Sequence, residues 1–161
     1  MTRTAVLFLL FQLGKDRYAL EARRVVEVLP FLDLKRVPQA PRGFAGIFNY
    51  RGRPVAAIDL CELTLGQLAA DRLSTRIVVV QFPDRQGQQR LVGLVAERAT
   101  ETLRRDPKDF VDPGVRVPAA PYLGPVLMDD RGTIQLIYEE HLMSDQVREL
   151  VLTDPSGLSH A

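Results

Sequence analysis

Short apolar runs separated by compact polar turns dominate the chain. Residues 8–13 and 18–20 flank a Gly-Lys-Asp-Arg turn, and residues 44–48 and 55–60 flank a turn that contains Asn-Tyr-Arg-Gly. Apolar runs of this length joined by turns rich in Gly, Asn and Asp are typical of β-hairpins. The first 60 residues therefore predict two hairpins.

The second half of the chain repeats this pattern. The β-branched runs 77–82 and 91–95 flank a polar loop, and the runs 126–128 and 133–138 bracket an Asp-Asp-Arg-Gly turn. These residues predict two further hairpins. Four hairpins of short strands with turns about every ten residues favour a mainly β fold built from small barrels, with two barrels in succession.

Helical patterns are short. Residues 21–28 predict one helical turn leading into a strand, and the prolines within 29–43 predict an extended connector. Residues 61–73 favour a short surface helix or a loop. Apolar positions near helical spacing predict an amphipathic helix over residues 139–152.

Residues 106–125 hold five prolines and two glycines. This content predicts irregular, extended chain rather than a linker between domains, because several apolar side chains are available to pack inward. The side chains expected to do so are those of Phe110, Val115, Val117 and Tyr122.

Composition narrows the class of protein. The hydrophobic fraction is 46% and the charged fraction 25%, as in ordinary soluble domains, and 21 basic residues against 20 acidic ones leave a net charge of +1. This balance gives no general attraction to nucleic acid or membrane. The apolar run 5–11 is too short to span a bilayer, and the charged turn that follows favours a buried first strand over a signal peptide.

The residue types expected of an active site are sparse. The usual phosphate, dinucleotide and nucleophile-elbow motifs are absent from the sequence. Cys61 is the only cysteine, which excludes an intramolecular disulfide and favours a reducing cytoplasm; it is interpreted as an inert buried thiol. The paired carboxylates Asp129-Asp130 and Glu139-Glu140 are interpreted as solvated surface. With His141 read as a partly exposed helix residue, the sequence predicts neither enzyme nor metal centre.

The most informative polar feature is the turn Asn49-Tyr50-Arg51-Gly52 between two apolar strands. Arginine carries a planar, permanently charged group that often anchors protein contacts. An ordinary exposed hairpin arginine fits the residues as well, so this pattern alone leaves both interpretations open.

The order and spacing of these segments resemble the CheW chemotaxis coupling family. In the first half the resemblance rests on Phe11 to Leu20, Val25 to Val28, Val37 to Pro41, Gly46 to Gly52 and Val55 to Leu60. In the second half it rests on residues 92–95, 122–124 and 132–137. It covers about residues 7–150.

The resemblance implies two small SH3-like five-stranded β-barrels that share a core, with a C-terminal helix. We expect a single domain over residues 7–152, with barrel one drawn largely from residues 15–75. Barrel two would be drawn largely from residues 76–138 plus strand 8–13. Residues 153–161 are expected to form a flexible tail.

The resemblance also implies a function. Members of this family are non-enzymatic adaptors without cofactors, which couple the cytoplasmic tips of methyl-accepting chemoreceptors to the regulatory domain of a CheA-type histidine kinase. Such an adaptor would be cytoplasmic, recruited to membrane receptor arrays without inserting into the membrane, and able to join other CheW-like domains in rings. The alternative is a small-barrel module that binds nucleic acid or peptide, which would require a clustered basic or aromatic face.

Site residues follow from the same resemblance. Val25, Glu27 and Val28 fall in the family segment that faces the receptor, and Gly46, Asn49 and Arg51 fall in its Asn-x-Arg-Gly signature. Arg51 is the strongest candidate, as a charged contact or as a brace for the receptor groove. The chain departs from the family pattern at Tyr50, at residues 96–99, at Pro125 and at residues 138–139.

Overall fold

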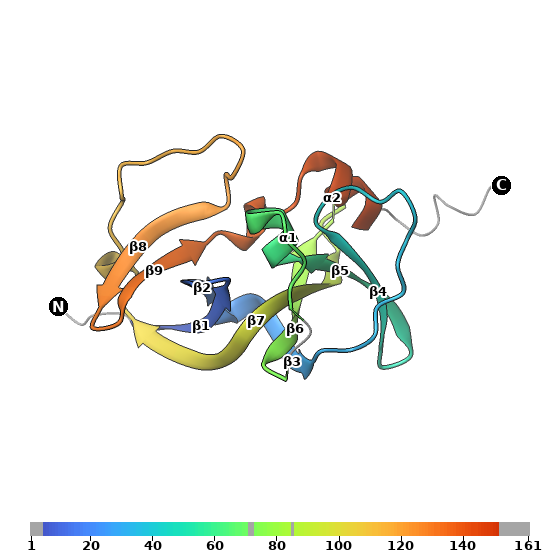
Figure 1. The fold of residues 1–161 in the computed structure, drawn as a ribbon, viewed down its shortest axis with the longest axis horizontal. Coiled ribbons are helices and arrows are strands. Elements are labelled where there is room, and N and C mark those ends of the chain that lie inside the picture. The colour runs from blue at the N-terminus through green and yellow to red at the C-terminus, as the bar shows by residue number, and fades with distance from the viewer. Residues whose placement is uncertain (1–4, 71–72, 85, 152–161) are drawn as a thin grey trace.

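The computed structural model describes residues 5–70, 73–84 and 86–151 (Figure 1). Most of these residues form β-strands, so the mainly β prediction is confirmed. The strands are β1 (Val6–Leu13), β2 (Asp16–Glu21), β3 (Val25–Pro30), β4 (Phe44–Tyr50), β5 (Arg53–Asp59), β6 (Thr75–Pro83), β7 (Gln89–Arg105), β8 (Leu123–Asp129) and β9 (Gly132–Ile137). The helices are α1 (Leu60–Leu65) and α2 (Asp145–Val151), with 3-10 turns at Ala22–Arg24, Pro107–Asp109 and Glu139–His141.

All four predicted hairpins form. Strands β1 and β2, β4 and β5, β6 and β7, and β8 and β9 pair antiparallel in sequence order. The predicted helical turn before the strand at Val25 also forms, as the Ala22–Arg24 turn. Local turn chemistry therefore determines the pairing of neighbouring strands.

The strands divide into two lobes that share β7. The first lobe contains β3, β6, the first half of β7, β5 and β4, in that hydrogen-bonded order, and lies on the right of Figure 1. The second lobe contains the second half of β7, then β1, β2, β9 and β8. Each lobe thus has five strands, but no continuous ladder closes either of them among the described residues.

This grouping differs from the expected division of the chain. Strand β2, expected in barrel one, pairs with β1 and in parallel with β9, whereas β6, expected in barrel two, pairs with β3. The reason is the 17-residue length of β7, which pairs with β6 along its first half and with β1 along its second. One long strand can serve two lobes, and hairpin patterns do not reveal that.

A single isolated bridge protects each of two outer strands. Lys35 and Ile47 exchange backbone hydrogen bonds of 2.8 and 2.9 Å beside β4, and Val111 and Val126 exchange bonds of the same lengths beside β8. Unpaired strand edges invite association with other chains, and such bridges limit that exposure. On its outer side β3 has no strand partner among the described residues.

The core is shared between the lobes. Its largest cluster contains side chains from β1 and β2 of the second lobe together with side chains from β5, β6 and β7. The C-terminal segment adds Leu142, Met143 and Val147 to this cluster. Smaller clusters fill the first lobe, around Phe48 and Ile77, and the second lobe, around Phe8 and Ile134.

The two helices are short, and Asp59 caps the first of them. Asp59 accepts hydrogen bonds from the backbone N–H groups of Cys61 and Glu62 at 2.9 and 3.1 Å, which starts α1 at Leu60, one residue before the predicted 61–73 region, and α1 ends within that region at Leu65. The helix expected over residues 139–152 is shorter, because the chain turns Leu142 and Met143 into the core before α2 begins at Asp145. A C-terminal helix is nevertheless present, as expected.

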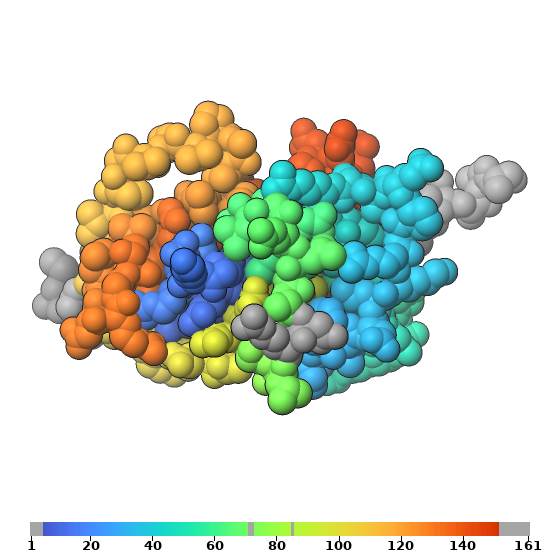
Figure 2. Space-filling view, viewed as in Figure 1, coloured from blue at the N-terminus to red at the C-terminus, as the bar shows by residue number. Residues whose placement is uncertain are grey.

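The irregular segment before β8 stands away from the rest of the second lobe. Phe110 and Tyr122 are buried as predicted, but Val115 and Val117 are exposed, because the loop between the two aromatic anchors bows outward. Figure 2 shows an opening between this segment and the strands below it. A cavity of about 690 Å³ lies there.

The expected tail, residues 153–161, lies outside the described residues. Within the described part of the chain, no helix has the length and apolar character needed to cross a membrane.

Candidate functional site

Arg51 occupies the tip of the β4–β5 hairpin and reaches across to β3. Its φ of 52° and that of Gly52, 83°, are the left-handed values of a tight two-residue turn. Asn49 stabilises this turn by accepting a 2.8 Å hydrogen bond from the N–H of Gly52. From here Arg51 Nη2 donates a 2.9 Å hydrogen bond to Glu27 Oε1, so the structure brings three of the predicted site residues together.

The Arg51–Glu27 pair is open to solvent. The Arg51 side chain is 72% exposed and that of Glu27 is 32% exposed. The hydrogen bond to Glu27 raises the pKa of Arg51, which stays charged in any case. An exposed pair of this kind contributes little to folding stability, so its charges remain available to a partner.

Tyr50, where the chain departs from the family pattern, packs against the Arg51 guanidinium. Its ring is buried in the first-lobe cluster and packs edge-on against Phe48, with 6.5 Å between ring centroids. The Arg51 guanidinium lies 5.4 Å from the Tyr50 ring centroid, within cation–π range. Loss of solvent around Tyr50 raises the pKa of its phenol. The substitution at this position therefore adds an aromatic platform beneath Arg51.

The predicted residues of β3 do not share one face. Val25 is half-buried and packs against the shared core, whereas Val28 points outward and is 37% exposed. Sequence reasoning missed Val26, which is 46% exposed. Val26 is the extra residue at a register shift between Val25 and Glu27 in the β3–β6 ladder, so no local pattern marked it.

Gly46 has a backbone role rather than a contact role. It is buried in β4 with φ of 147°, and a Cβ placed there would lie 2.5 Å from the carbonyl oxygen of Lys35. Only glycine allows the Lys35–Ile47 bridge to come this close. The glycine of the signature thus shapes the first lobe and does not reach the surface.

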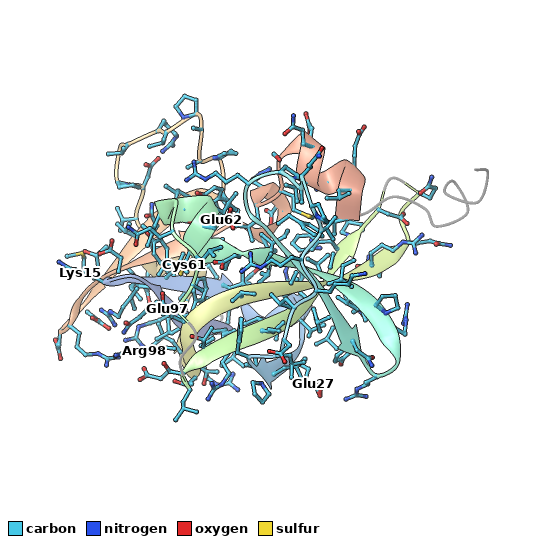
Figure 3. The ribbon with its side chains drawn as sticks, turned by 45° about the vertical axis from the view of Figure 1, so that its right-hand side comes forward. Lys15, Glu27, Cys61, Glu62, Glu97 and Arg98 are labelled. Carbon is cyan, nitrogen blue, oxygen red and sulfur yellow. The ribbon has the colours of Figure 1, made fainter. Side chains whose placement is uncertain are left out.

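These residues define one candidate surface, which we call the β3–hairpin surface. It combines two exposed valines with a charged pair on an unpaired strand edge, and Figure 3 shows where Glu27 lies on it. Exposed apolar side chains beside charged ones are typical of protein-binding surfaces. Its members are Val26, Glu27, Val28, Asn49 and Arg51.

Cys61 has no nucleophilic character. It is buried at the start of α1, and its Sγ donates to Glu97 Oε1 at 3.1 Å (Figure 3). Burial, followed by the negative charge of Glu97, raises the pKa of the thiol to about 12. The burial of Cys61 is confirmed, and a thiol with this pKa is protonated at neutral pH, which supports the interpretation of Cys61 as inert.

Of the carboxylate pairs, Glu139 departs from the expected solvated surface. Its side chain is only 3% exposed and lies 3.1 Å from Arg24 Nε. Burial raises the pKa of Glu139 to about 7, and Arg24 opposes that shift. The surface interpretation was wrong for this residue, because the core around the C-terminal segment encloses it.

Asp129 is also held by an arginine. Arg17 donates to both of its carboxylate oxygens, one hydrogen bond measuring 2.9 Å, and this lowers the pKa of Asp129 to about 2. The pair ties the β8–β9 turn to β2. Among the described residues no group of three or more His, Cys, Asp or Glu side chains could hold a metal ion.

Comparison with known proteins places this geometry in context. A solved scaffolding protein, TtCheW from Thermoanaerobacter tengcongensis, superposes with a TM-score of 0.74 at 23% sequence identity, covering 89% of this chain and 90% of that one. At this identity the likeness speaks for the fold.

Two curated relatives are named chemotaxis protein CheW. The one from Helicobacter pylori is 32% identical over 108 residues, which are 66% of this chain and 61% of the relative. The one from Klebsiella aerogenes is 29% identical over 96 residues, 60% of this chain and 55% of the relative. The matches thus span less than two thirds of either relative. The profile of the CheW-like domain matches residues 7–147, and the chain belongs to the CheW-like domain family.

Proposed function

We propose that this protein is a non-enzymatic chemosensory adaptor that couples methyl-accepting chemoreceptors to a CheA-type histidine kinase. The observation that carries the proposal is the Arg51–Glu27 pair, which joins the signature hairpin to the receptor-facing segment at 2.9 Å. Two residues that the family resemblance assigns to one interface thus meet in space.

The chemistry of the β3–hairpin surface suits a protein partner. Val26 and Val28 offer apolar area, and the adjacent exposed charges can exchange partners when a complementary surface docks. Such an interface would be modest and reversible, as is common in signalling assemblies. We place the protein in the cytoplasm, recruited to receptor arrays, where further contacts with CheW-like domains would build rings.

The competing function, a nucleic-acid or peptide-binding module, has less support. Base stacking requires exposed aromatic side chains on a basic face. Among the described residues only one Phe or Tyr side chain, that of Tyr138, is exposed, and the net charge of the whole chain is +1. Neither feature favours a nucleic-acid platform.

The test is capture of two separate fragments, the receptor tip and the kinase regulatory domain of the source organism. Wild-type protein is compared with Arg51→Glu, in which charge reversal sets two acidic side chains against each other. We expect loss of receptor-tip capture in a variant whose melting temperature is unchanged. The double variant Arg51→Glu with Glu27→Arg restores the pair in reverse and shows whether the pair itself or its orientation matters.

Arg116→Glu is the matched control. Arg116 is similarly exposed and also forms an ion pair, with Asp112 at 2.7 Å, but it lies in the irregular segment of the second lobe. Its reversal should leave receptor capture intact. Failure of the wild-type protein to capture either fragment would contradict the adaptor function, and equal losses in both reversals would show a general charge effect.

A further inference from the structure

A second polar site lies where β7 passes from one lobe to the other. A cavity of about 420 Å³ opens there, a volume within the range of small-molecule sites. It is lined by Arg17, Arg98, Arg131, Glu101 and the polar side chains of Gln12, Ser74 and Thr100. Three guanidinium groups thus border one cavity, together with two hydroxyl groups and an amide.

Arg98 is held in this wall by an unusual backbone. Its φ is 50°, the left-handed region that non-glycine residues rarely adopt. Arg98 lies within a register shift of the β1–β7 ladder. On one side of the shift Gln12 pairs with Glu97, and on the other side Leu10 pairs with Glu101. The Arg98 N–H is fixed by a 2.8 Å hydrogen bond to the Ser74 carbonyl. Backbone strain of this kind is often kept where a side chain serves a ligand.

Two of the three arginines that line the cavity are paired with a carboxylate among the described residues. Arg17 is paired with Asp129, and Arg131 donates to Glu101 at 3.2 Å. Among the described residues no hydrogen bond or ion pair engages the Arg98 side chain, although Glu97 is its neighbour in sequence. The Glu97 carboxylate accepts from the Cys61 thiol instead. Within the described part of the chain, Arg98 therefore lines the cavity without a carboxylate partner.

We infer that this cavity binds a small organic anion that carries a phosphate or carboxylate group, with Arg98 as its principal partner. Arginine presents paired donors that match either group, and the hydroxyl groups of Ser74 and Thr100 add neutral donors. This site is separate from the β3–hairpin surface and does not depend on the proposed adaptor function.

The test uses pyrophosphate and citrate as probes, titrated into the full chain at constant ionic strength and followed by calorimetry and by amide NMR shifts. Wild-type protein should bind at least one probe saturably, with shifts centred on residues 98–101 and 131. Arg98→Gly should weaken that binding about tenfold or more, the effect of losing one charge-assisted contact. Because glycine adopts a φ of 50° without strain, this variant should fold at least as well as wild type.

Two further variants test whether anion binding depends on the position and on the planar guanidinium group of Arg98. Arg104→Ala removes an exposed arginine from the same strand but outside the cavity, and should leave binding unchanged. Arg98→Lys keeps the charge without the planar fork, and should weaken binding less than glycine does. The inference fails if neither probe saturates, if Arg98→Gly binds like wild type, or if Arg104→Ala loses as much. It also fails if Arg98→Gly affects only capture of a receptor or kinase fragment, because the cavity would then belong to a protein interface.

Discussion

The two lobes contain the same chemical pair in different settings. In the second lobe Arg17 forms an ion pair with Asp129, and the two side chains are only 12% and 24% exposed. This contact joins β2 to the β8–β9 turn. In the first lobe Arg51 holds Glu27 at the surface, with the arginine 72% exposed. A guanidinium–carboxylate pair thus joins two elements in a partly enclosed setting in one lobe, and stays open to solvent at a hairpin tip in the other.

Each lobe also has an open strand edge. Both β4 and β8 are covered by one isolated bridge, whereas β3 in the first lobe and the second half of β7 in the second lobe have an edge without a strand partner among the described residues. The exposed ion pair stands beside the β3 edge. We therefore propose the binding surface at the first-lobe edge, where the Arg51–Glu27 pair stands.

Gly46→Ala should break the first lobe most severely. The new methyl group would lie 2.5 Å from the Lys35 carbonyl oxygen, so the Lys35–Ile47 bridge must open or the strand must shift. We expect a loss of about 2–4 kcal/mol in the free energy of unfolding, measured by urea denaturation. Gly52→Ala is the control, because it also has a positive φ but no atom within 4 Å of the new group. Equal losses in the two variants would contradict the close-approach role of Gly46.

The buried Glu139–Arg24 contact predicts a pH dependence. The pKa of Glu139 is raised to about 7 in the folded protein, so between about pH 4.5 and 7 the folded state binds a proton that the unfolded state has lost. Stability should therefore fall as pH rises through this window, by on the order of 1–3 kcal/mol. Thermal melts from pH 5 to 8 should show this fall, and Glu139→Gln should flatten it. A wild-type profile that is already flat would contradict the raised pKa.

Asp129→Asn tests the structural pair of the second lobe. Removing the carboxylate charge should lower the free energy of unfolding by about 1 kcal/mol at pH 7, the scale expected of a partly exposed pair. Because the pKa of Asp129 is lowered to about 2, its contribution is complete above about pH 4 and disappears as pH falls toward 2. Acid titration of wild type and variant should therefore converge at low pH. Persistent separation of the two curves at pH 2 would assign the effect to packing.

Arg51→Ala should have the smallest effect on folding. The pair it breaks is exposed, so the melting temperature should remain within about 1 °C of wild type. Receptor-tip capture should nevertheless weaken, measured by the same pull-down. If Arg51→Ala destabilised the protein as much as Asp129→Asn does, the difference between the two lobes would disappear.

Residues in the turns predicted the hairpins, whereas the pairings between strands that are distant in sequence could not be predicted. The turn residues around Gly14, Gly52 and Gly132 fixed three hairpins, because these glycines adopt the positive φ that their turns require. The family resemblance singled out Arg51 through the signature and Glu27 through the receptor-facing segment, but only the fold could show their contact. The grouping of strands into lobes depended on β7 and on parallel pairings between distant segments, which leave no local pattern.

Burial of single polar residues was equally hard to predict. Glu139 follows Tyr138 in a segment with the pattern of an amphipathic helix, and nothing nearby in the sequence marks Arg24 as its partner. The exposure of Val26 and the strained backbone of Arg98 also arise from register shifts in the ladders. Such shifts depend on how strands meet, which the order of residues alone does not specify.

The parallel pairing of β2 with β9 has a consequence for how the protein is made. Arg17 lies opposite Ile134, so the second lobe cannot assemble until nearly the whole domain has left the ribosome. The hairpins of the first lobe are complete in sequence by Arg105 and can form earlier. During synthesis the β1–β2 hairpin therefore remains without its β9 partner until residues 132–137 have emerged.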